Sequence, residues 1–196
     1  MKKVLIIIFF LSSFVASAQD SDVENISPIS VTVNPSFFVL GGYSVKGFYH
    51  LPKRWSFGVA AEAGFELPDF ARDQFFDNAE DLTIHWDYLL GVEARYRFHD
   101  AQLDKGFYIQ GTLGIEGWTA TDVNGSEDQF DNWYSSLGVG YNWYPFKKPK
   151  FHLGASYNVV FILNNTDTRT AGTQEYSINS VVPPNFAPTI YLGWRF

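Results

Sequence analysis

A strict alternation of apolar and polar residues from Ile84 to Phe98 is the feature that most restricts what this chain can fold into. The even positions are all apolar, and most odd positions are charged or polar. Successive side chains of an extended strand point to opposite faces, so a period of two is typical of a β-strand. We therefore predict a strand at 84–98 with one apolar and one polar face.

The same pattern, interrupted by turns, runs through the rest of the chain. The other predicted strands are Ile29 to Leu40, Tyr43 to Leu51, Trp55 to Leu67, Phe107 to Trp118, Trp133 to Phe146, Phe151 to Leu163 and Ala187 to Phe196. No window of twelve residues has convincing helical periodicity. Pro35 interrupts the first strand because proline cannot donate to a ladder, but single-chain bacterial barrels have even strand numbers and need this strand to close.

These patterns predict an all-β fold. Together with the leader, the strand glycines, the aromatic residues and the last strand described below, they predict an eight-stranded antiparallel up-and-down transmembrane β-barrel at residues 29–196. Residues 1–18 carry Lys2 and Lys3, an apolar run and a small-residue ending, which is typical of a cleaved signal peptide. Residues 19–28 form a short polar lead-in.

Removing the two leader lysines takes the net charge from −7 to −9, so nucleic acid is not expected as a partner. The 0 cysteines exclude a disulfide framework and a lipoprotein anchor.

A soluble lipocalin-type barrel would also have one apolar and one polar face, with the apolar face inside. The positions of the strand glycines favour the opposite arrangement, with the apolar face outside. Strand glycines lie mostly on the charged face: Gly58, Gly64, Gly91, Gly114, Gly138, Gly140, Gly154 and Gly193. A wall that faces solvent gains nothing from glycine, whereas a narrow closed barrel filled with charged side chains needs the room. We therefore predict that the apolar face is turned toward lipid.

On this interpretation, charges of both signs fill the lumen. The predicted lumen charge network is Lys46, Glu62, Glu66, Asp87, Glu93, Arg95, Arg97, Glu116 and Arg195. Opposite charges in a narrow, poorly hydrated space should pair, because an unpaired buried ion is costly. Eight strands enclose a space that side chains can fill, so we expect a filled barrel and not an open pore.

The connections divide into two sets. Short connections carry Lys53, Arg54, Lys105, Lys147, Lys148 and Lys150, and long connections carry Asp69, Asp73, Asp77, Glu80, Asp81, Asp122, Glu127, Asp128 and Asp131. Near the basic turns lie the aromatic residues expected at a membrane boundary: Trp55, Tyr96, Phe98, Trp143, Tyr144, Phe146, Phe151, Trp194 and Phe196. Phe70, Phe75, Phe76, Phe130, Val181, Val182 and Phe186 are the apolar residues of the long connections. They either form a partner surface or pack over the barrel mouth.

The last ten residues, A-P-T-I-Y-L-G-W-R-F, place Ile190, Leu192, Trp194 and Phe196 on one face. This ending resembles the C-terminal strand of bacterial outer-membrane β-barrels, although the fuller pattern has glycine where Tyr191 stands. The architecture from Ile29 onward is similar to OmpA- or OmpX-type barrels and to barrel-domain proteins of Bacteroidota. The resemblance implies a location in the cell outer membrane, contact with its lipid and lipopolysaccharide, and recognition of the last strand by the barrel assembly machinery.

The candidates for chemistry are few. A lipid-modifying barrel enzyme would need a nucleophile and a base within reach of the bilayer. His50, His99 and His152, the last sharing a face with Ser156, lie in or beside turns or in the lumen, and His85 with Asp87 is the least unfavourable base. Asp122, Asn124, Ser126 and Asp128 alternate like calcium ligands but lack the EF-hand glycine and glutamate.

We therefore expect no catalytic, cofactor or metal site. The expected function is structural or surface-interacting, through acidic and aromatic external loops. The alternatives left open are a narrow channel or transporter for small hydrophobic or ionic solutes and, third, a lipid-modifying enzyme. The acidic loops also suggest contact with the divalent cations that bridge lipopolysaccharide.

Overall fold

The computed structural model describes residues 27–98, 105–146, 150–183 and 189–196. The predicted signal peptide and most of the lead-in lie outside these residues, as do His99, Lys147, Lys148 and Phe186. No helix in the described part of the chain is long and apolar enough to cross a membrane.

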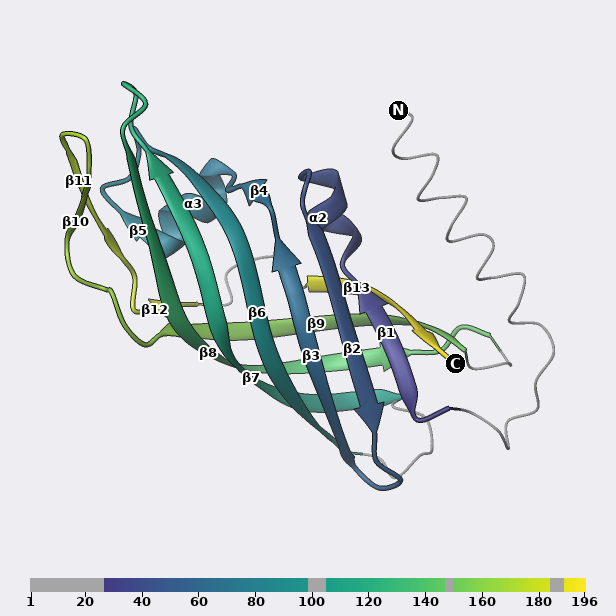
Figure 1. Ribbon diagram of the computed structural model, residues 1–196. Helices are drawn as coiled ribbons and strands as arrows, with labels where there is room; N and C mark the ends of the chain where they lie inside the picture. Colours follow the sequence, from purple (N-terminus) through teal and green to yellow (C-terminus); the bar gives the residue numbers. More distant parts are fainter. Residues whose placement is uncertain (1–26, 99–104, 147–149, 184–188) are drawn as a thin grey trace.

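Eight strands form a closed antiparallel barrel (Figure 1). They are β1 (Ile29–Val33), β2 (Tyr43–His50), β3 (Trp55–Ala63), β6 (Thr83–Arg97), β7 (Gly106–Thr121), β8 (Glu127–Trp143), β9 (Phe151–Ile162) and β13 (Thr189–Arg195). Each pairs with the next in this order, and β13 returns to β1 with a register from Ser30 opposite Arg195 to Val33 opposite Leu192. The predicted eight-stranded fold, including pairing of the first strand with the last, is confirmed.

The first strand is shorter than predicted, because a helix replaces its second half. Strand β1 ends at Val33, and helix α2 (Pro35–Val39) follows. The side chain of Asn34 accepts a hydrogen bond from the Ser36 backbone N–H at 3.0 Å and caps the helix. Proline fits the first helical position, where no backbone N–H is needed. The prediction of a strand at 29–40 is therefore wrong beyond residue 33, and α2 packs beside β2 and β13 in its place.

The two ends of the barrel differ. At one end, the turn end, lie the strand ends that the short connections join: His50 and Trp55, Arg97 and Gly106, and Trp143 and Phe151. At the other, the loop end, lie α2 and the elements α3 (Asp69–Phe75), β4 (Phe65–Glu66), β5 (Phe76–Asp77), β10 (Arg169–Ala171), β11 (Gln174–Ile178) and β12 (Val181–Val182) (Figure 1). The connection between the strands predicted at 107–118 and 133–146, which was expected to be long, is instead a β-hairpin, because β7 and β8 stay paired as far as Thr121 and Glu127.

The inward and outward directions of the side chains exchange near the loop end on two neighbouring strands. In β6, Asp87 is the extra residue of a bulge, since Trp86 pairs with Trp118 while Tyr88 pairs with Gly117. In the adjacent strand the exchange occurs at Ala63, whose φ of 128° is unusual for a residue with a side chain. The assignment of even and odd positions to the two faces, predicted along 84–98 and 55–67, therefore holds only toward the turn end.

Four predicted lipid-facing residues consequently point inward, and two predicted lumen carboxylates do not. Phe65, Leu67, Ile84 and Trp86 belong to or pack on a buried apolar cluster. Glu66 is exposed, and Asp87 is partly exposed beside His85, on the opposite face from Ile84 and Trp86. The assignment of Glu66 and Asp87 to the lumen is thus corrected. The interior has two layers: an aromatic layer near the loop end and a charged layer below it.

The aromatic layer gathers side chains from strands and loop-end elements. Its buried members include Phe65, Leu67, Phe76, Ile84, Leu89, Trp118, Ala120, Phe130, Tyr176 and Ile178. Trp86 stacks on Trp118 with ring centroids 5.2 Å apart and planes 6° apart. Of the loop apolar residues, Phe75, Phe76 and Phe130 pack here, and Val182 is buried outside this cluster. Phe70 and Val181 remain 66% and 50% exposed. The three phenylalanines therefore cover the barrel mouth.

Inward glycines lie directly across the sheet from large inward side chains. Tyr108 is opposite Gly140, Phe48 is opposite Gly58, and His152 is opposite Gly193. A Cβ added at Gly140 would lie 2.6 Å from Cε2 of Tyr108, closer than non-bonded carbon atoms approach. Glycine is required at these positions because a ring lies over the partner strand.

Candidate functional site

The charged layer consists of Lys46 from β2, Glu62 from β3, and Glu93 and Arg95 from β6. Nε of Arg95 donates to Oε1 of Glu93 at 2.6 Å, and Nζ of Lys46 donates to Oε2 of Glu93 at 3.2 Å. Glu62 is held more loosely: its Oε1 accepts from the Ser44 hydroxyl at 2.6 Å, and its Oε2 lies 3.7 Å from Nζ of Lys46. Two cations and two carboxylates thus form one connected network.

Aromatic rings pack around the two cations. The guanidinium of Arg95 lies 3.9 Å from the ring centroid of Phe48 and 4.7 Å from that of Tyr108. The ammonium of Lys46 lies 5.1 Å from the ring centroid of Tyr191. These positions suit cation–π attraction in a desolvated setting. Glu93 is only 2% exposed and Arg95 3%, so these two side chains are almost completely enclosed by their neighbours.

Three other members of the predicted network, Arg97, Glu116 and Arg195, are buried elsewhere. Arg97 donates to the backbone carbonyls of the turn at 51–55, including that of Leu51 at 2.8 Å. Arg195 donates from Nε to the carbonyl of Ser27 at 2.9 Å. Glu116 is buried opposite Asn132 on the paired strand. Arg97 and Arg195 therefore tie chain segments at the turn end.

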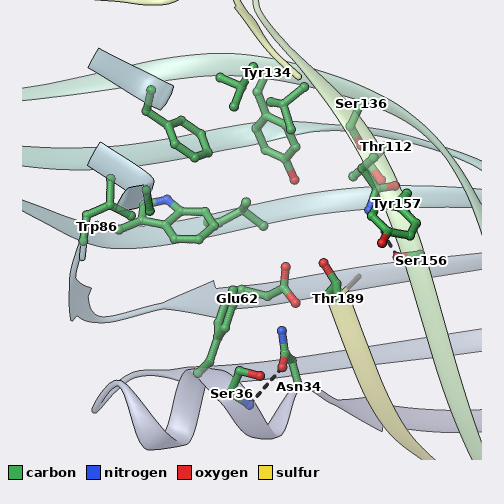
Figure 2. Close-up of a pocket in the computed structure, with 18 of the residues that line it drawn as sticks. Asn34, Ser36, Glu62, Trp86, Thr112, Tyr134, Ser136, Ser156, Tyr157 and Thr189 are labelled. Atoms are coloured by element: carbon green, nitrogen blue, oxygen red, sulfur yellow. Dashed lines mark hydrogen bonds between the residues drawn. The ribbon is translucent and has the colours of Figure 1, made fainter. Parts of the chain in front are cut away.

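A cavity of about 380 Å³ lies between the charged layer and the loop end. In Figure 2 the carboxylate of Glu62 and the side chains of Asn34 and Thr189 point toward one another on one side of it. Trp86 forms an apolar wall, and Tyr134 directs its hydroxyl into the space. The other lining residues include Phe37 of α2 and its C-cap Leu40, together with Phe65, Leu89, Gln110, Ser136, Phe70 and Phe75. The cavity thus combines an aromatic wall with a polar floor, a combination that the sequence pattern did not predict.

The histidines do not assemble a catalytic site with the neighbours that the structure gives them. His50 is buried between the hydroxyls of Ser30 and Ser56, at 2.7 and 2.9 Å. His152 is buried beside the ring of Tyr144, at a centroid distance of 5.1 Å. Tyr144 is itself buried, so its assignment to the membrane boundary is corrected.

His85 lies near the loop end and is partly exposed. Its Nδ1 is 2.7 Å from Oδ1 of Asp87, and the Thr119 hydroxyl donates to Oδ2 of Asp87 at 2.7 Å. Asp87 therefore joins two neighbouring strands, and the geometry accounts for the His85–Asp87 pair without a substrate.

The two carboxylates considered for calcium accept hydrogen bonds from protein groups. Oδ1 of Asp122 accepts hydrogen bonds from the backbone N–H groups of Asn124 and Ser126, each at 2.8 Å, and the bond from Ser126 contributes most to lowering the pKa of Asp122. Asp128 instead accepts two bonds from Arg169, at 2.7 and 2.8 Å, and one from the hydroxyl of Tyr176 at 2.7 Å. Asp122 and Asp128 therefore accept hydrogen bonds from different parts of the chain.

The contact between Asp128 and Arg169 joins the β7–β8 hairpin to the β10–β11 hairpin. Desolvation raises the pKa of Asp128, but the bonds from Arg169 and Tyr176 outweigh it and lower this pKa. The guanidinium of Arg169 also lies 4.3 Å from the ring centroid of Phe130. The two hairpins consequently form one structured surface at the loop end.

The predicted boundary aromatics cluster at the turn end. Trp55 packs edge-on against Tyr96 at 5.1 Å, and Tyr96 against Phe98 at 6.1 Å. Phe146 packs against Phe151 at 6.0 Å. Trp55, Phe98, Trp143, Phe146 and Phe196 are exposed, and Tyr96, Phe151 and Trp194 are partly exposed.

No family model and no curated protein matches the chain. Among solved structures, it is similar to Ail, the attachment invasion locus protein of Yersinia pestis, with a TM-score of 0.44 and 13% identity, over 87% of this chain and 99% of that chain. It is also similar to Neisserial surface protein A, with a TM-score of 0.38 and 15% identity, over 88% and 100% of the two chains. The fold assignment rests on the strand pairing described above.

Proposed function

We propose that the protein is an integral outer-membrane β-barrel with a filled lumen, which acts as a structural or surface-interaction protein through its loop end. The sealed charged layer is the observation that carries this proposal. A water-filled channel would leave lumen side chains accessible, whereas Glu93 and Arg95 are almost completely enclosed. The predicted export by a cleaved signal peptide accords with this location.

The outer wall supports placement in a membrane. Between the turn end and the level of Trp133, exposed outward side chains are largely apolar: Val45, Phe57, Val59, Leu90, Val92, Ile109, Leu113, Leu137, Val139 and Ile190. A soluble protein rarely exposes so extended an apolar surface. Transmembrane barrels have such an outward apolar band, flanked by aromatic residues at the interfaces. Lipid is the partner that this band fits.

The filled lumen predicts that the purified, refolded protein gives no large, steady conductance in a planar lipid bilayer. Migration on a gel should change on heating, as expected for a compact barrel, and this change verifies that the inserted sample is folded. Ion flow through the barrel would require the network of Lys46, Glu93 and Arg95 to open. A stable open state of the folded protein would favour the alternative of a narrow channel and contradict the filled lumen.

The surface role predicts protection of the loop end by lipopolysaccharide. The loop end carries many carboxylates, among them the exposed Asp73 and Glu127, which divalent cations can bridge to lipid phosphates. In nanodiscs containing lipopolysaccharide and Mg²⁺, trypsin cleavage at Arg72 and Arg169 should slow, and a chelator should restore it. Nanodiscs of phospholipid alone provide the control. Equal cleavage with and without chelator would exclude cation-bridged lipopolysaccharide as the partner.

A further inference from the structure

We propose that the cavity above the charged layer binds a small arylalkyl amine, with its ring against the aromatic wall and its ammonium group at Glu62. This inference goes beyond the surface role and needs no passage of solute through the barrel. The volume of about 380 Å³ lies within the roughly 300–1,000 Å³ of small-molecule sites. Such sites combine an apolar wall with a few placed polar groups, as this cavity does.

The wall fits an aromatic body. Trp86 is fixed by its stacking on Trp118, and Phe37 packs edge-on against Phe65 at 4.9 Å and against Trp86 at 5.7 Å. These rings are therefore preorganised, and a ligand ring need not order them on binding. The indole N–H of Trp86 is buried without a hydrogen-bond partner among the described residues. The π face of an aromatic ligand is able to accept such a donor weakly.

The floor favours a donor or a cation. Glu93 has two close cationic partners, at 2.6 and 3.2 Å, whereas the cationic partner of Glu62 among the described residues is Lys46, at 3.7 Å. Glu62 is thus the less neutralised of the two carboxylates, and it is the one that lines the cavity. Oε1 of Gln110, another lining residue, is buried and has no partner in the described part of the chain. Lys46 also lines the cavity, but its ammonium group already donates to Glu93 at 3.2 Å. Glu62 and Gln110 therefore remain as acceptors for a ligand donor, and a ligand carboxylate would face Glu62 unfavourably.

The test compares three probes of the same shape on the full mature chain in nanodiscs at neutral pH. They are phenethylamine, which is cationic, phenethyl alcohol, which is neutral, and 3-phenylpropionate, which is anionic. Isothermal titration calorimetry, after subtraction of the signal from empty nanodiscs, should show saturable binding of the amine. The affinity should decrease from the amine to the alcohol to the carboxylate. Carboxylate binding as tight as amine binding, or no saturable amine binding, would overturn the proposal without any variant.

Two matched substitutions locate the site. Glu62→Gln should weaken amine binding by at least about tenfold, because a charge-assisted hydrogen bond becomes a neutral one. Glu66→Gln makes the same chemical change four residues later at an exposed position, and it should leave the affinity unchanged. Heat-dependent migration checks that each variant is folded. If folded Glu62→Gln retains the full amine affinity, or Glu66→Gln loses it equally, the assignment to Glu62 is wrong. Neither result bears on the absence of conductance or on protection by lipopolysaccharide.

Discussion

Replacing Glu93 by glutamine is expected to lower the free energy of unfolding of the barrel by about 3–5 kcal/mol. The substitution removes the carboxylate that receives both Arg95, at 2.6 Å, and Lys46, at 3.2 Å. Because these groups are buried, the two cations would be left with Glu62 as their remaining network carboxylate, and it lies 3.7 Å from Lys46. Urea unfolding in lipid vesicles, followed by heat-dependent gel migration, measures the loss.

Glu127→Gln is the control for this prediction. Glu127 begins β8 at an exposed position, so its substitution should change stability by less than about 0.5 kcal/mol. The double variant Glu93→Gln/Arg95→Met should regain part of the loss, because it also removes the unpaired guanidinium and leaves an apolar side chain between Phe48 and Tyr108. An effect of Glu93→Gln no larger than that of Glu127→Gln would show that the charged layer does not stabilise the fold.

Replacing Gly140 by alanine is expected to destabilise the barrel by about 1–3 kcal/mol, although only one methyl group is added. The new Cβ would stand 2.6 Å from Cε2 of Tyr108, and this ring cannot move freely because the guanidinium of Arg95 lies 4.7 Å from its centroid. The same unfolding assay applies. Gly47→Ala is the matched control, since a Cβ on this strand glycine meets nothing within 4 Å.

Truncating the opposing ring should relieve the overlap. In the background Tyr108→Leu, the further change Gly140→Ala should cost less than it costs in the native chain, because the two residues face each other across β7 and β8. Equal costs in both backgrounds would mean that the glycine acts through backbone flexibility and not through the space that it leaves for the ring.

Most of the barrel follows from the sequence because the direction of a strand side chain is a local property. Alternation in segments such as 84–98 predicted the strands and the face that carries Glu93 and Arg95. Glycines on that face predicted a crowded interior, and Tyr108 over Gly140 is an instance of it. Short helices such as α2 were missed, since five residues give too little periodicity to detect. Pro35 could have indicated this helix, because proline suits the first helical position, but it was interpreted as an interruption of a strand.

The pairing between strands determines which side chains point inward near the loop end, and local sequence patterns could not predict this. The bulge at Asp87 and the backbone at Ala63 exchange the two faces near the loop end, and they depend on how β3, β6 and β7 align. This exchange turns Trp86 inward and Glu66 outward, and so creates the aromatic layer. The sequence by itself therefore determined an eight-stranded barrel with charges inside, because the direction of each side chain follows from its own backbone. Only the tertiary structure decided which charges meet and where the cavity lies, because both depend on the register between strands.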